Sequence, residues 1–288
     1  MPKNDKIAVL SGYHLNEIMA KVNEGAKEGD ISLNLGISKT KFYHVAEKVV
    51  FPEYNSSIDL SEIKKLLKKR SLNDCFTVND DQLIWIYSFS DQYGVLKLYE
   101  PKVDYPPTLF INGSYMHAIR VSKPTEEAFE KAKMLKGVSG NVLDTCFGLG
   151  YSTIQLRKYQ SIKKVVACEI SPEAIEIAKV NPWSNDAFMD KSIDLHNEDV
   201  SEFAKAAKEK SFDGILHDPP NFNKFEYLYS ESFYSELCRI LKPNGKLYHF
   251  IGTKGTGNLG IYRSAKRKLQ AAGFSRVTEG YRGLIAIK

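Results

Sequence analysis

The chain from about residue 122 onwards alternates between strand-like and helix-like segments, and this alternation limits the fold more than any other feature. Helical spacing links the apolar residues Ile175 and Ala178, and likewise Phe233 and Leu237. The largely apolar run at 164–170 lacks the alternation of a half-exposed strand, as expected for a parallel strand covered on both faces. The pattern predicts a doubly wound α/β fold with a mostly parallel sheet. The predicted strands are residues 141–144, 164–170, 212–217 and 246–251.

The first part of the chain has a different pattern of predicted secondary structure, with short β-like runs and one helix. The helix is predicted over residues 61–69, because Asp59 is a favourable N-cap. Several prolines within 101–107 mark a connection. We therefore predict a small α+β domain over residues 1–115 and a Rossmann-like domain over residues 116–288. The strands predicted in the smaller domain are residues 31–35, 41–45, 82–89 and 95–99.

The composition excludes several classes of protein. With 43% hydrophobic and 26% charged residues, the 288-residue chain is typical of a globular protein. It has no apolar run of transmembrane length, and its polar start lacks the apolar core of a signal peptide, so we expect a cytoplasmic protein without membrane contact. The four cysteines have no zinc-ligand spacing, so we expect no metal. A net charge of +5 permits a nucleic-acid partner without requiring one.

A loop with two glycines follows the first predicted strand of the larger domain. Residues 144–150 read Asp-Thr-Cys-Phe-Gly-Leu-Gly. Gly148 and Gly150 permit positive φ angles and a close approach of a ligand to the backbone. The helix that follows offers free N–H groups at its start, and Asp144 closes the strand at the end where nucleotides bind in such folds. The loop predicts a nucleotide-like ligand, with a purely structural turn as the alternative.

An acidic residue at the end of the next strand extends this interpretation. Glu169 lies 25 residues after Asp144. An acid in that place can accept hydrogen bonds from both hydroxyl groups of a ribose, whereas the simpler alternative is a surface glutamate. Because dinucleotide enzymes share this layout, the two features together leave the NAD-dependent and the S-adenosylmethionine-dependent classes open.

The segment after residues 212–217 resembles the class I S-adenosylmethionine-dependent methyltransferases. Residues 217–222 read His-Asp-Pro-Pro-Asn-Phe, and these enzymes end their fourth strand in Asp/Asn-Pro-Pro and an aromatic residue when the acceptor is an amino nitrogen. The Asp218 carboxylate and the Pro219 carbonyl can accept two N–H bonds from an amine and so aim its lone pair. Phe222 can stack on a flat acceptor. The resemblance implies these three residues as catalytic.

The same resemblance implies S-adenosyl-L-methionine as the cofactor and no metal. It implies a seven-stranded sheet whose last strand is antiparallel. It assigns the methionine part of the cofactor to Asp144 and the glycine loop, the ribose to Glu169 and the adenine amino group to Asp199. A helix N-cap is the alternative role for Asp199. The predicted cofactor-binding residues are Asp144, Cys146, Gly148, Gly150, Glu169 and Asp199.

More narrowly, the whole chain resembles an uncharacterised group of archaeal predicted methyltransferases. The resemblance covers both predicted domains, and some such proteins are described as polyamine synthases, which share the fold. The segments that carry it are residues 106–108, 116–117, 143–151, 181–184, 217–220 and 233–237.

We therefore predict a methyltransferase acting on a nitrogen of an acceptor, with RNA as the best guess and a protein or small amine as the others. The alternative is aminopropyl transfer from decarboxylated S-adenosylmethionine, and a non-catalytic binding module is a third hypothesis. A cationic amine needs an acidic pocket, and the sequence has no dense acidic cluster near Asp218, which counts against the alternative. His117 and the loop at 252–257 are further candidates for lining the pocket.

Overall fold

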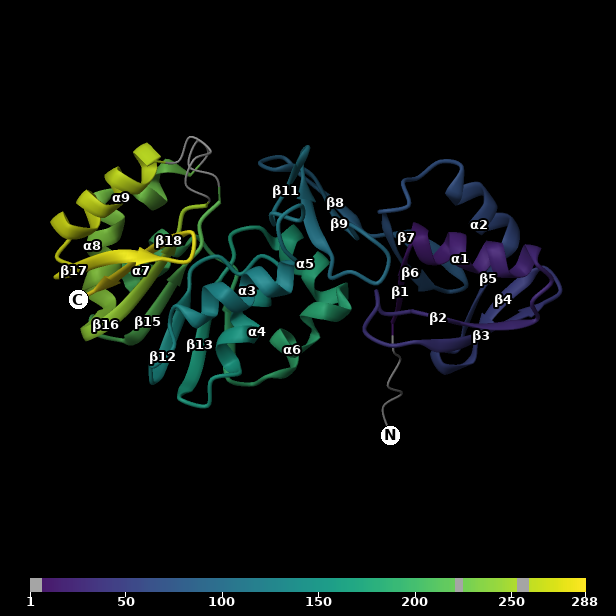
Figure 1. The fold of residues 1–288 in the computed structure, drawn as a ribbon, viewed down its shortest axis with the longest axis horizontal. Helices are drawn as coiled ribbons and strands as arrows, with labels where there is room; N and C mark the ends of the chain where they lie inside the picture. Colours follow the sequence, from purple (N-terminus) through teal and green to yellow (C-terminus); the bar gives the residue numbers. More distant parts are fainter. Residues whose placement is uncertain (1–6, 221–224, 253–258) are drawn as a thin grey trace. The chain divides into compact units, whose positions relative to one another are not determined.

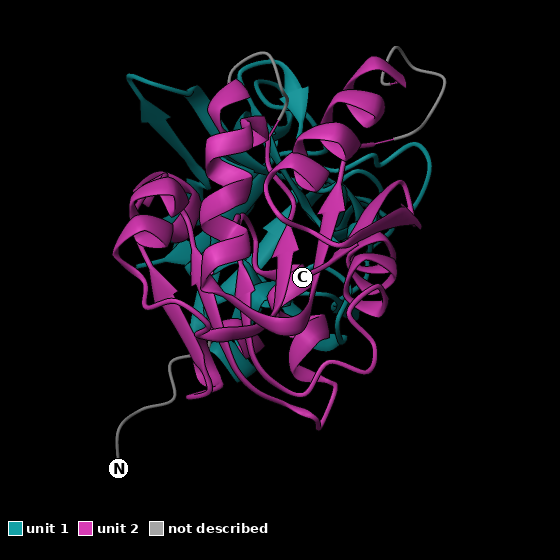
Figure 2. Ribbon diagram, turned by 90° about the vertical axis from the view of Figure 1, so that its left-hand side faces the viewer, with its two compact units in different colours: residues 1–124, 176–185 teal, residues 125–175, 186–288 magenta. Residues whose placement is uncertain are grey.

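A computed structural model describes residues 7–220, 225–252 and 259–288. The chain divides into two compact units (Figure 2). Unit 1 consists of residues 1–124 and 176–185, and unit 2 of residues 125–175 and 186–288. The division at residues 115 and 116 expected from the sequence stays a prediction.

Unit 2 is built on a seven-stranded sheet with the order β14-β13-β12-β15-β16-β18-β17 (Figure 1). Strands β12 to β16 are parallel, and β18 runs antiparallel to both of its neighbours. The predicted mostly parallel sheet with an antiparallel last strand is thus confirmed. The strands are β12 (Gly140–Asp144), β13 (Ile162–Cys168), β14 (Ile193–His196), β15 (Phe212–His217), β16 (Leu241–Phe250), β17 (Arg276–Gly280) and β18 (Gly283–Ile287).

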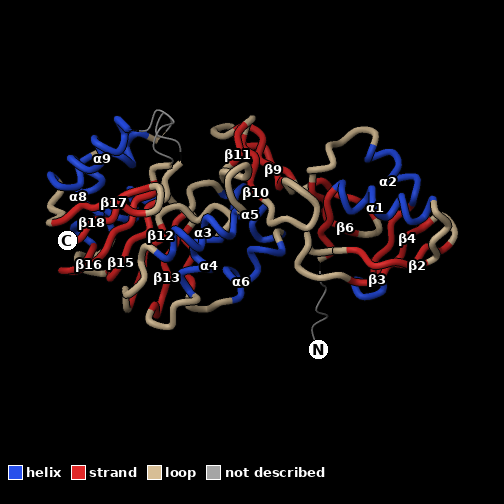
Figure 3. The backbone as a smooth tube through the Cα atoms, viewed as in Figure 1, coloured by secondary structure: helices blue, strands red, loops and turns tan. Residues whose placement is uncertain are grey.

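Helices connect and cover these strands (Figure 3). One buried cluster joins Ala132 and Leu156 on helices to Val142 and Leu216 on strands. Burial of this kind, rather than helix propensity, supplies most of the stability of short helices. The helices are α3 (Pro124–Lys133), α4 (Tyr151–Arg157), α5 (Pro172–Val180), α6 (Asn185–Met189), α7 (Val200–Ala206), α8 (Glu231–Ile240) and α9 (Leu259–Ala271), with the short 3₁₀ segments η2 (Pro182–Ser184) and η3 (Glu226–Tyr229).

The direction in which the sheet grows reverses between β12 and β15. From β12 the chain adds β13 and β14 on one side, and then β15 and β16 on the other. Loops that leave the carboxyl ends of the two central strands therefore diverge and leave a crevice, the usual place for a ligand in open α/β sheets. Asp144 ends β12 and Asp218 follows β15, so the two predicted acids flank this point.

Unit 1 contains three antiparallel sheets, with the orders β1-β6-β7, β2-β3-β4-β5 and β11-β10-β9-β8. Its apolar core includes Leu15, Phe42, Phe51 and Phe76. The strands are β1 (Ala8–Ser11), β2 (Glu28–Ile31), β3 (Thr40–Val45), β4 (Lys48–Phe51), β5 (Ser56–Asp59), β6 (Cys75–Asn79), β7 (Gln82–Trp85), β8 (Tyr87–Ser90), β9 (Gly94–Tyr99), β10 (Thr108–Ile111) and β11 (Ser114–Tyr115), and the helices are α1 (Gly12–Asn23), η1 (Pro52–Tyr54) and α2 (Leu60–Leu67).

Unit 1 departs from the sequence predictions in two places. The helix α1 was not predicted, although Ser11 caps it and forms a capping box with His14. The strand predicted at 82–89 is two strands that part at Ile86. The Ile86 N–H bonds to Cys75 of one sheet, and its carbonyl accepts the Leu98 N–H of another, so this residue passes the chain between sheets.

Unit 2 departs from the sequence predictions at one turn. The turn expected at residues 243–245 lies inside β16, where Asn244 adopts a positive φ of 61°. The pairing of β16 with β15 shifts register at the same place, between Phe212 and Gly214. The turn residues thus form an irregularity within a strand rather than its start.

Candidate active site

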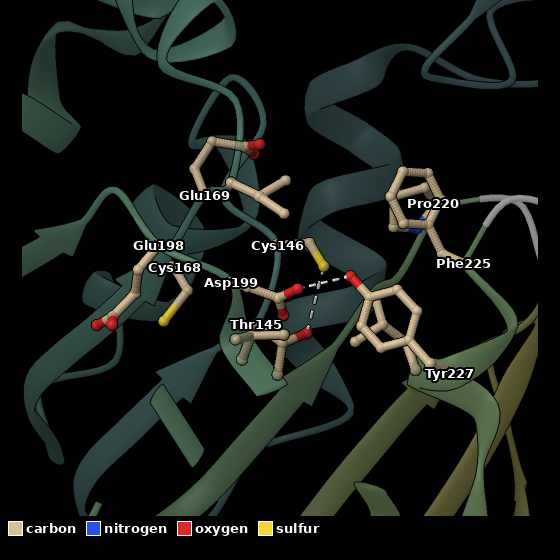
Figure 4. A pocket seen from close by; sticks show the side chains of 12 residues that line it. Thr145, Cys146, Cys168, Glu169, Glu198, Asp199, Pro220, Phe225 and Tyr227 are labelled. Atoms are coloured by element: carbon tan, nitrogen blue, oxygen red, sulfur yellow. Dashed lines mark hydrogen bonds between the residues drawn. The ribbon is translucent and has the colours of Figure 1, made fainter. Parts of the chain in front are cut away.

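A pocket opens among the loops that follow four adjacent parallel strands of unit 2 (Figure 4). Each strand contributes the residues directly after its carboxyl end, and the 3₁₀ segment η3 closes the remaining side. This matches the position expected for a ligand at the switch point. The lining residues are Thr145, Cys146, Cys168, Glu169, Ile170, Glu198, Asp199, Val200, Pro220, Phe225, Tyr227 and Leu228.

The glycine loop forms one wall of the pocket and depends on both of its glycines. Gly148 has a φ of 56° and donates its N–H to Glu169 Oε2 at 2.8 Å. Gly150 has a φ of 75°, and a Cβ atom there would lie 2.5 Å from the ring of Phe147. Cys146 lies between the glycines and Asp144 and lines the pocket. The loop is therefore held by its own contacts and presents Thr145 and Cys146 to the pocket, while binding of the ligand by Cys146, Gly148 and Gly150 stays a prediction.

Asp144 supports this loop from inside rather than lining the pocket. Its side chain is fully buried and accepts hydrogen bonds from Thr153 Oγ1 at 2.7 Å and from the Cys146 N–H at 3.4 Å. Burial raises the pKa of Asp144 to about 7, although the bond from Thr153 works in the opposite direction. The direct contact with the ligand that the sequence assigned to Asp144 stays a prediction.

Glu169 follows β13 and does line the pocket. Its two carboxylate oxygens accept the N–H groups of Gly148 at 2.8 Å and Ser171 at 3.0 Å. Burial raises the pKa of Glu169, and the backbone bonds lower it in part. Each oxygen keeps a further acceptor position, as a ribose contact requires.

Asp199 caps a helix and also lines the pocket, while its predicted contact with adenine stays a prediction. One oxygen caps α7 by accepting the Ser201 N–H at 2.7 Å, and the other accepts the Tyr227 hydroxyl at 2.9 Å (Figure 4). The residue also lines the pocket beside Glu198. An N-cap and a ligand contact are thus compatible at this position.

Asp218 forms part of a chain of four charged groups. Its Oδ2 lies 2.6 Å from Lys131 Nζ of α3, and the same ammonium lies 3.3 Å from Glu127 Oε2. Glu127 Oε1 in turn accepts a hydrogen bond from Arg282 Nη1 at 2.5 Å. Two carboxylates and two cations alternate, so their formal charges cancel. The Lys131 ammonium also lies 4.0 Å from the centre of the Phe250 ring.

The pKa values of Asp218 and Lys131 follow from their burial and from the ion pairs that they form. Burial raises the pKa of Asp218, while Lys131 pulls it down. Burial alone would lower the pKa of Lys131, but the attraction of Asp218 and Glu127 outweighs it and the pKa is raised. Lys131 therefore stays an ammonium whose side chain is only 5% exposed.

The sequence analysis did not identify the other three charged groups, Lys131, Glu127 and Arg282, as part of the site. Glu127 and Lys131 are four residues apart on a helix, which is usually read as a solvent-exposed ion pair. One signal was present: Lys131 lies three residues after Ala128 and four before Leu135, on the face predicted to be buried. Arg282 is 155 residues from Glu127 and carried no comparable signal.

A buried polar network lies directly behind the pocket wall. Thr145 Oγ1 lies 2.9 Å from His217 Nδ1, and His217 Nε2 lies 3.0 Å from the Leu228 carbonyl oxygen. The carbonyl can only accept, so His217 carries its proton on Nε2 and Thr145 donates to Nδ1. Burial lowers the pKa of His217 well below its usual value, so the ring stays neutral. The network fixes the Thr145 side chain that lines the pocket.

Other predicted residues lie elsewhere. Pro219 is buried directly after Asp218. Phe222 and positions 253–257 of the loop at 252–257 lie outside the described residues. His117 belongs to unit 1, where its Nδ1 lies 2.8 Å from Thr108 Oγ1, and it is not part of the described pocket lining.

Potential metal ligands are scattered. Within the described parts of the chain, His, Cys, Asp and Glu side chains do not gather into a group of three that would suit a metal ion. No described helix is both long and apolar enough to cross a bilayer.

Comparison with known proteins gives the family. The sheet order and the acidic pocket at its switch point define a Rossmann-like fold of the kind that binds S-adenosylmethionine-like ligands. A model of the spermine/spermidine synthase domain matches residues 127–278, which include the pocket lining and Asp218. The chain belongs to the spermine/spermidine synthase domain family.

Relatives with sequence similarity fall into two groups. The uncharacterized protein MJ1233 of Methanocaldococcus jannaschii is 32% identical over 291 residues, covering 97% of each chain. A polyamine aminopropyltransferase of Prochlorococcus marinus is 29% identical over 178 residues, 60% of this chain and 61% of that enzyme. A polyamine aminopropyltransferase of Saccharolobus solfataricus is 37% identical over 103 residues, 34% of each. The chain thus matches these enzymes over only part of their length.

Solved structures confirm the fold. The spermidine synthase from Thermotoga maritima superimposes with a TM-score of 0.56 at 19% identity, over 73% of this chain and 76% of that one. A spermidine synthase in complex with the transition state analogue AdoDATO gives a TM-score of 0.58 at 17% identity, over 73% and 77%.

The prediction of a methyltransferase is therefore wrong. The family model and the aminopropyltransferase relatives favour the alternative that the sequence reasoning ranked second. The reason given against it fails for the pocket, because its described lining brings together Glu169, Glu198 and Asp199, which lie well before Asp218 in the chain. The Asp-Pro-Pro segment alone does not separate methyl transfer from aminopropyl transfer.

Proposed function

We propose that this protein transfers a 3-aminopropyl group from decarboxylated S-adenosylmethionine to an amine. The donor differs from S-adenosylmethionine only in lacking the α-carboxylate, so it carries a sulfonium and an ammonium without a compensating anion. A site that selects it must offer negative charge and no partner for a carboxylate.

The charge of the pocket lining is the observation that carries the proposal. The described lining contains three carboxylates, those of Glu169, Glu198 and Asp199, and no lysine, arginine or histidine. The N–H of Gly148, a natural partner for a carboxylate, already binds Glu169. The field of these three carboxylates opposes a donor that bears an α-carboxylate and favours the decarboxylated donor, whose net charge is more positive.

The residues fit the steps of this reaction. The acceptor nitrogen attacks the methylene carbon that joins the aminopropyl group to sulfur, that carbon–sulfur bond breaks, and its electron pair stays on sulfur to give 5′-methylthioadenosine. The attacking nitrogen loses one proton. In our proposal the Asp218 carboxylate and the Pro219 carbonyl orient the amine, and Asp218 accepts that proton.

The donor would occupy the pocket itself. We propose that Glu169 binds the ribose, Asp199 binds the adenine amino group, and Cys146 contacts the donor from the glycine loop. Asp144, Gly148 and Gly150 keep that loop in shape, as their hydrogen bonds and positive φ angles indicate. Phe222 keeps its predicted role of stacking on the acceptor.

Calorimetry with a matched pair of donors tests the proposal. We expect decarboxylated S-adenosylmethionine to bind at least about tenfold more tightly than S-adenosylmethionine, because only the latter brings a carboxylate into an acidic pocket. 5′-Methylthioadenosine serves as the control, because it has the nucleoside part without the aminopropyl group. Equal affinities, or tighter binding of S-adenosylmethionine, would contradict the proposal.

A further inference from the structure

Unit 1 exposes a sheet face rich in aromatic side chains, far in sequence from the pocket residues. In the sheet β11-β10-β9-β8, the inner face carries the buried Leu96, Leu98 and Leu109. The alternate residues form the outer face. We call the following residues the aromatic face: Tyr87, Phe89, Tyr99, Phe110 and Tyr115 of this sheet, together with Trp85 at the end of β7, which belongs to the sheet β1-β6-β7.

Strand register places three of these rings and one lysine in a row. Tyr87 is opposite Lys97, Lys97 is opposite Phe110, and Phe110 is opposite Tyr115, so one row crosses all four strands. Neighbouring ring centres are 5.0 Å apart for Tyr99 and Tyr115, and 5.3 Å apart for Phe110 and Tyr115. Figure 1 shows β8, β9 and β11 in this sheet.

The face is open rather than covered. Tyr87 is 53% exposed, Phe89 is 64% exposed and Tyr115 is 39% exposed. Folded domains rarely leave a contiguous patch of large apolar side chains in water unless it binds something. Isolated exposed aromatics would need no explanation, but a row in register across a sheet does.

One cation, Arg70, contacts the aromatic face at one end. The guanidinium of Arg70 lies 3.8 Å from the centre of the Trp85 ring, and Trp85 stacks on Tyr87 with 4.2 Å between ring centres. Arg70 ends the basic run of α2 and its following turn. The run consists of the exposed residues Lys64, Lys65, Lys68, Lys69 and Arg70.

These five cations keep their charge available for a partner. None of them takes part in an ion pair with a carboxylate of the described residues. Lys97 lies among the residues of the aromatic face, and its charge is neutralised by Asp74, whose Oδ1 is 2.6 Å from Lys97 Nζ. Glu62, the acid of α2, accepts the Leu83 N–H on the inner side. The surface thus combines stacking rings with uncompensated positive charge.

We propose that the aromatic face and the basic run together bind single-stranded nucleic acid, RNA in particular. Exposed rings on a sheet stack on unpaired bases, and nearby lysines and arginines contact the phosphates. A second copy of this chain fits less well, because a symmetric dimer through this face would bring two basic runs to one interface.

Fluorescence anisotropy with a labelled oligouridylate tests the proposal on the full chain. We expect salt-sensitive binding by the wild type. The double variant Tyr87→Ala/Phe89→Ala should bind about tenfold more weakly or worse, because each base stack contributes that much. Lys68→Gln/Lys69→Gln should reduce the slope of log affinity against log salt by about 0.7 for each phosphate that is no longer neutralised.

Two controls separate the outcomes. Ile84→Ala removes an exposed side chain next to Trp85 but outside the aromatic face and should leave RNA affinity unchanged. Circular dichroism should show that all variants melt like the wild type, since the replaced side chains are exposed. Absence of RNA binding by the wild type, or equal affinity of the Tyr87/Phe89 variant, would overturn the proposal. So would a sedimentation experiment in which that variant changes a dimer to a monomer while RNA affinity stays the same.

Discussion

The carboxylates on the two sides of the switch point are held in different ways. On the side of β13 and β14, Glu169 accepts two backbone N–H groups and Asp199 accepts one N–H and a tyrosine hydroxyl. On the side of β15, Asp218 accepts the ammonium of Lys131. We call these the donor side and the acceptor side, according to the proposed function.

The donor side and the acceptor side differ in net charge. Neutral N–H and O–H donors satisfy the oxygens of Glu169 and Asp199 without cancelling their charge. The ion pair at Asp218 cancels it, and Glu127 with Arg282 repeats the pattern. The donor side therefore attracts a cationic ligand by its field, whereas the acceptor side acts only at contact distance. Four substitutions test this contrast, with expected effects that run from about a hundredfold down to about threefold.

The largest effect is expected for Asp218→Asn. The amide keeps the shape but cannot accept a proton, so the rate of aminopropyl transfer should fall about a hundredfold or more, while the donor dissociation constant stays the same. Initial rates and calorimetry measure the two quantities. Asp194→Asn, which breaks an exposed ion pair with Lys164, is the matched control. A variant that retains its rate would remove Asp218 from the mechanism.

Lys131→Met should have the next largest effect, and it should depend on pH. Burial already raises the pKa of Asp218, and loss of the cation that lowers it must raise it further. Because the reaction needs the ionised carboxylate, activity at neutral pH should fall about tenfold and the acid limb of the rate profile should move to higher pH.

The pH profile also provides the controls for Lys131. Lys131→Arg keeps the charge and should restore most of the wild-type profile. Lys133→Met, on the same helix but with an exposed ammonium paired to Glu130, should leave the profile unchanged. An unshifted acid limb in Lys131→Met would show that the ion pair has only a structural role.

Glu169→Gln tests the donor side. The amide keeps the size of the side chain but only one acceptor oxygen, so one negative charge is lost together with one of the two backbone N–H bonds. We expect calorimetry to show donor binding about tenfold weaker, with the rate at saturating donor nearly unchanged. Glu176→Gln, an exposed glutamate paired with Lys179, is the control. An unchanged affinity would show that the charge of Glu169 does not attract the donor.

The smallest effect is expected for Tyr227→Phe. Only the hydroxyl that donates to Asp199 is removed, so donor affinity should weaken about threefold. Competition binding against a fluorescent nucleoside measures a change of this size. Tyr43→Phe, on the surface of unit 1, should bind the donor like the wild type. A loss as large as that of Glu169→Gln would mean that Tyr227 contacts the donor itself.

Much of the donor side could be predicted from the sequence because each residue is tied to a strand end. Glu169 and Asp199 follow β13 and β14, and the parallel sheet brings those ends together whatever the details of packing. Gly148 and Gly150 were predicted for the same reason, and both adopt the positive φ angles expected of them.

The acceptor side could not be predicted in the same way, since its partners come from distant segments. Lys131 lies 87 residues before Asp218, and a helical lysine is usually solvent-exposed. Methyl transfer was favoured because of the Asp-Pro-Pro segment, and the acids near Asp218 in space, such as Glu127 and Asp144, are distant from it in the sequence. The helix α1 was missed because its apolar stripe is short, with Leu15, Ile18 and Met19 buried.

Product analysis tests the central claim most directly. The protein is incubated with decarboxylated S-adenosylmethionine and a panel of diamines and polyamines, and the nucleosides are identified by mass spectrometry. We predict release of 5′-methylthioadenosine together with an equal amount of an amine that has gained one aminopropyl group. Release of S-adenosylhomocysteine from S-adenosylmethionine, with no 5′-methylthioadenosine from the decarboxylated donor, would contradict the account.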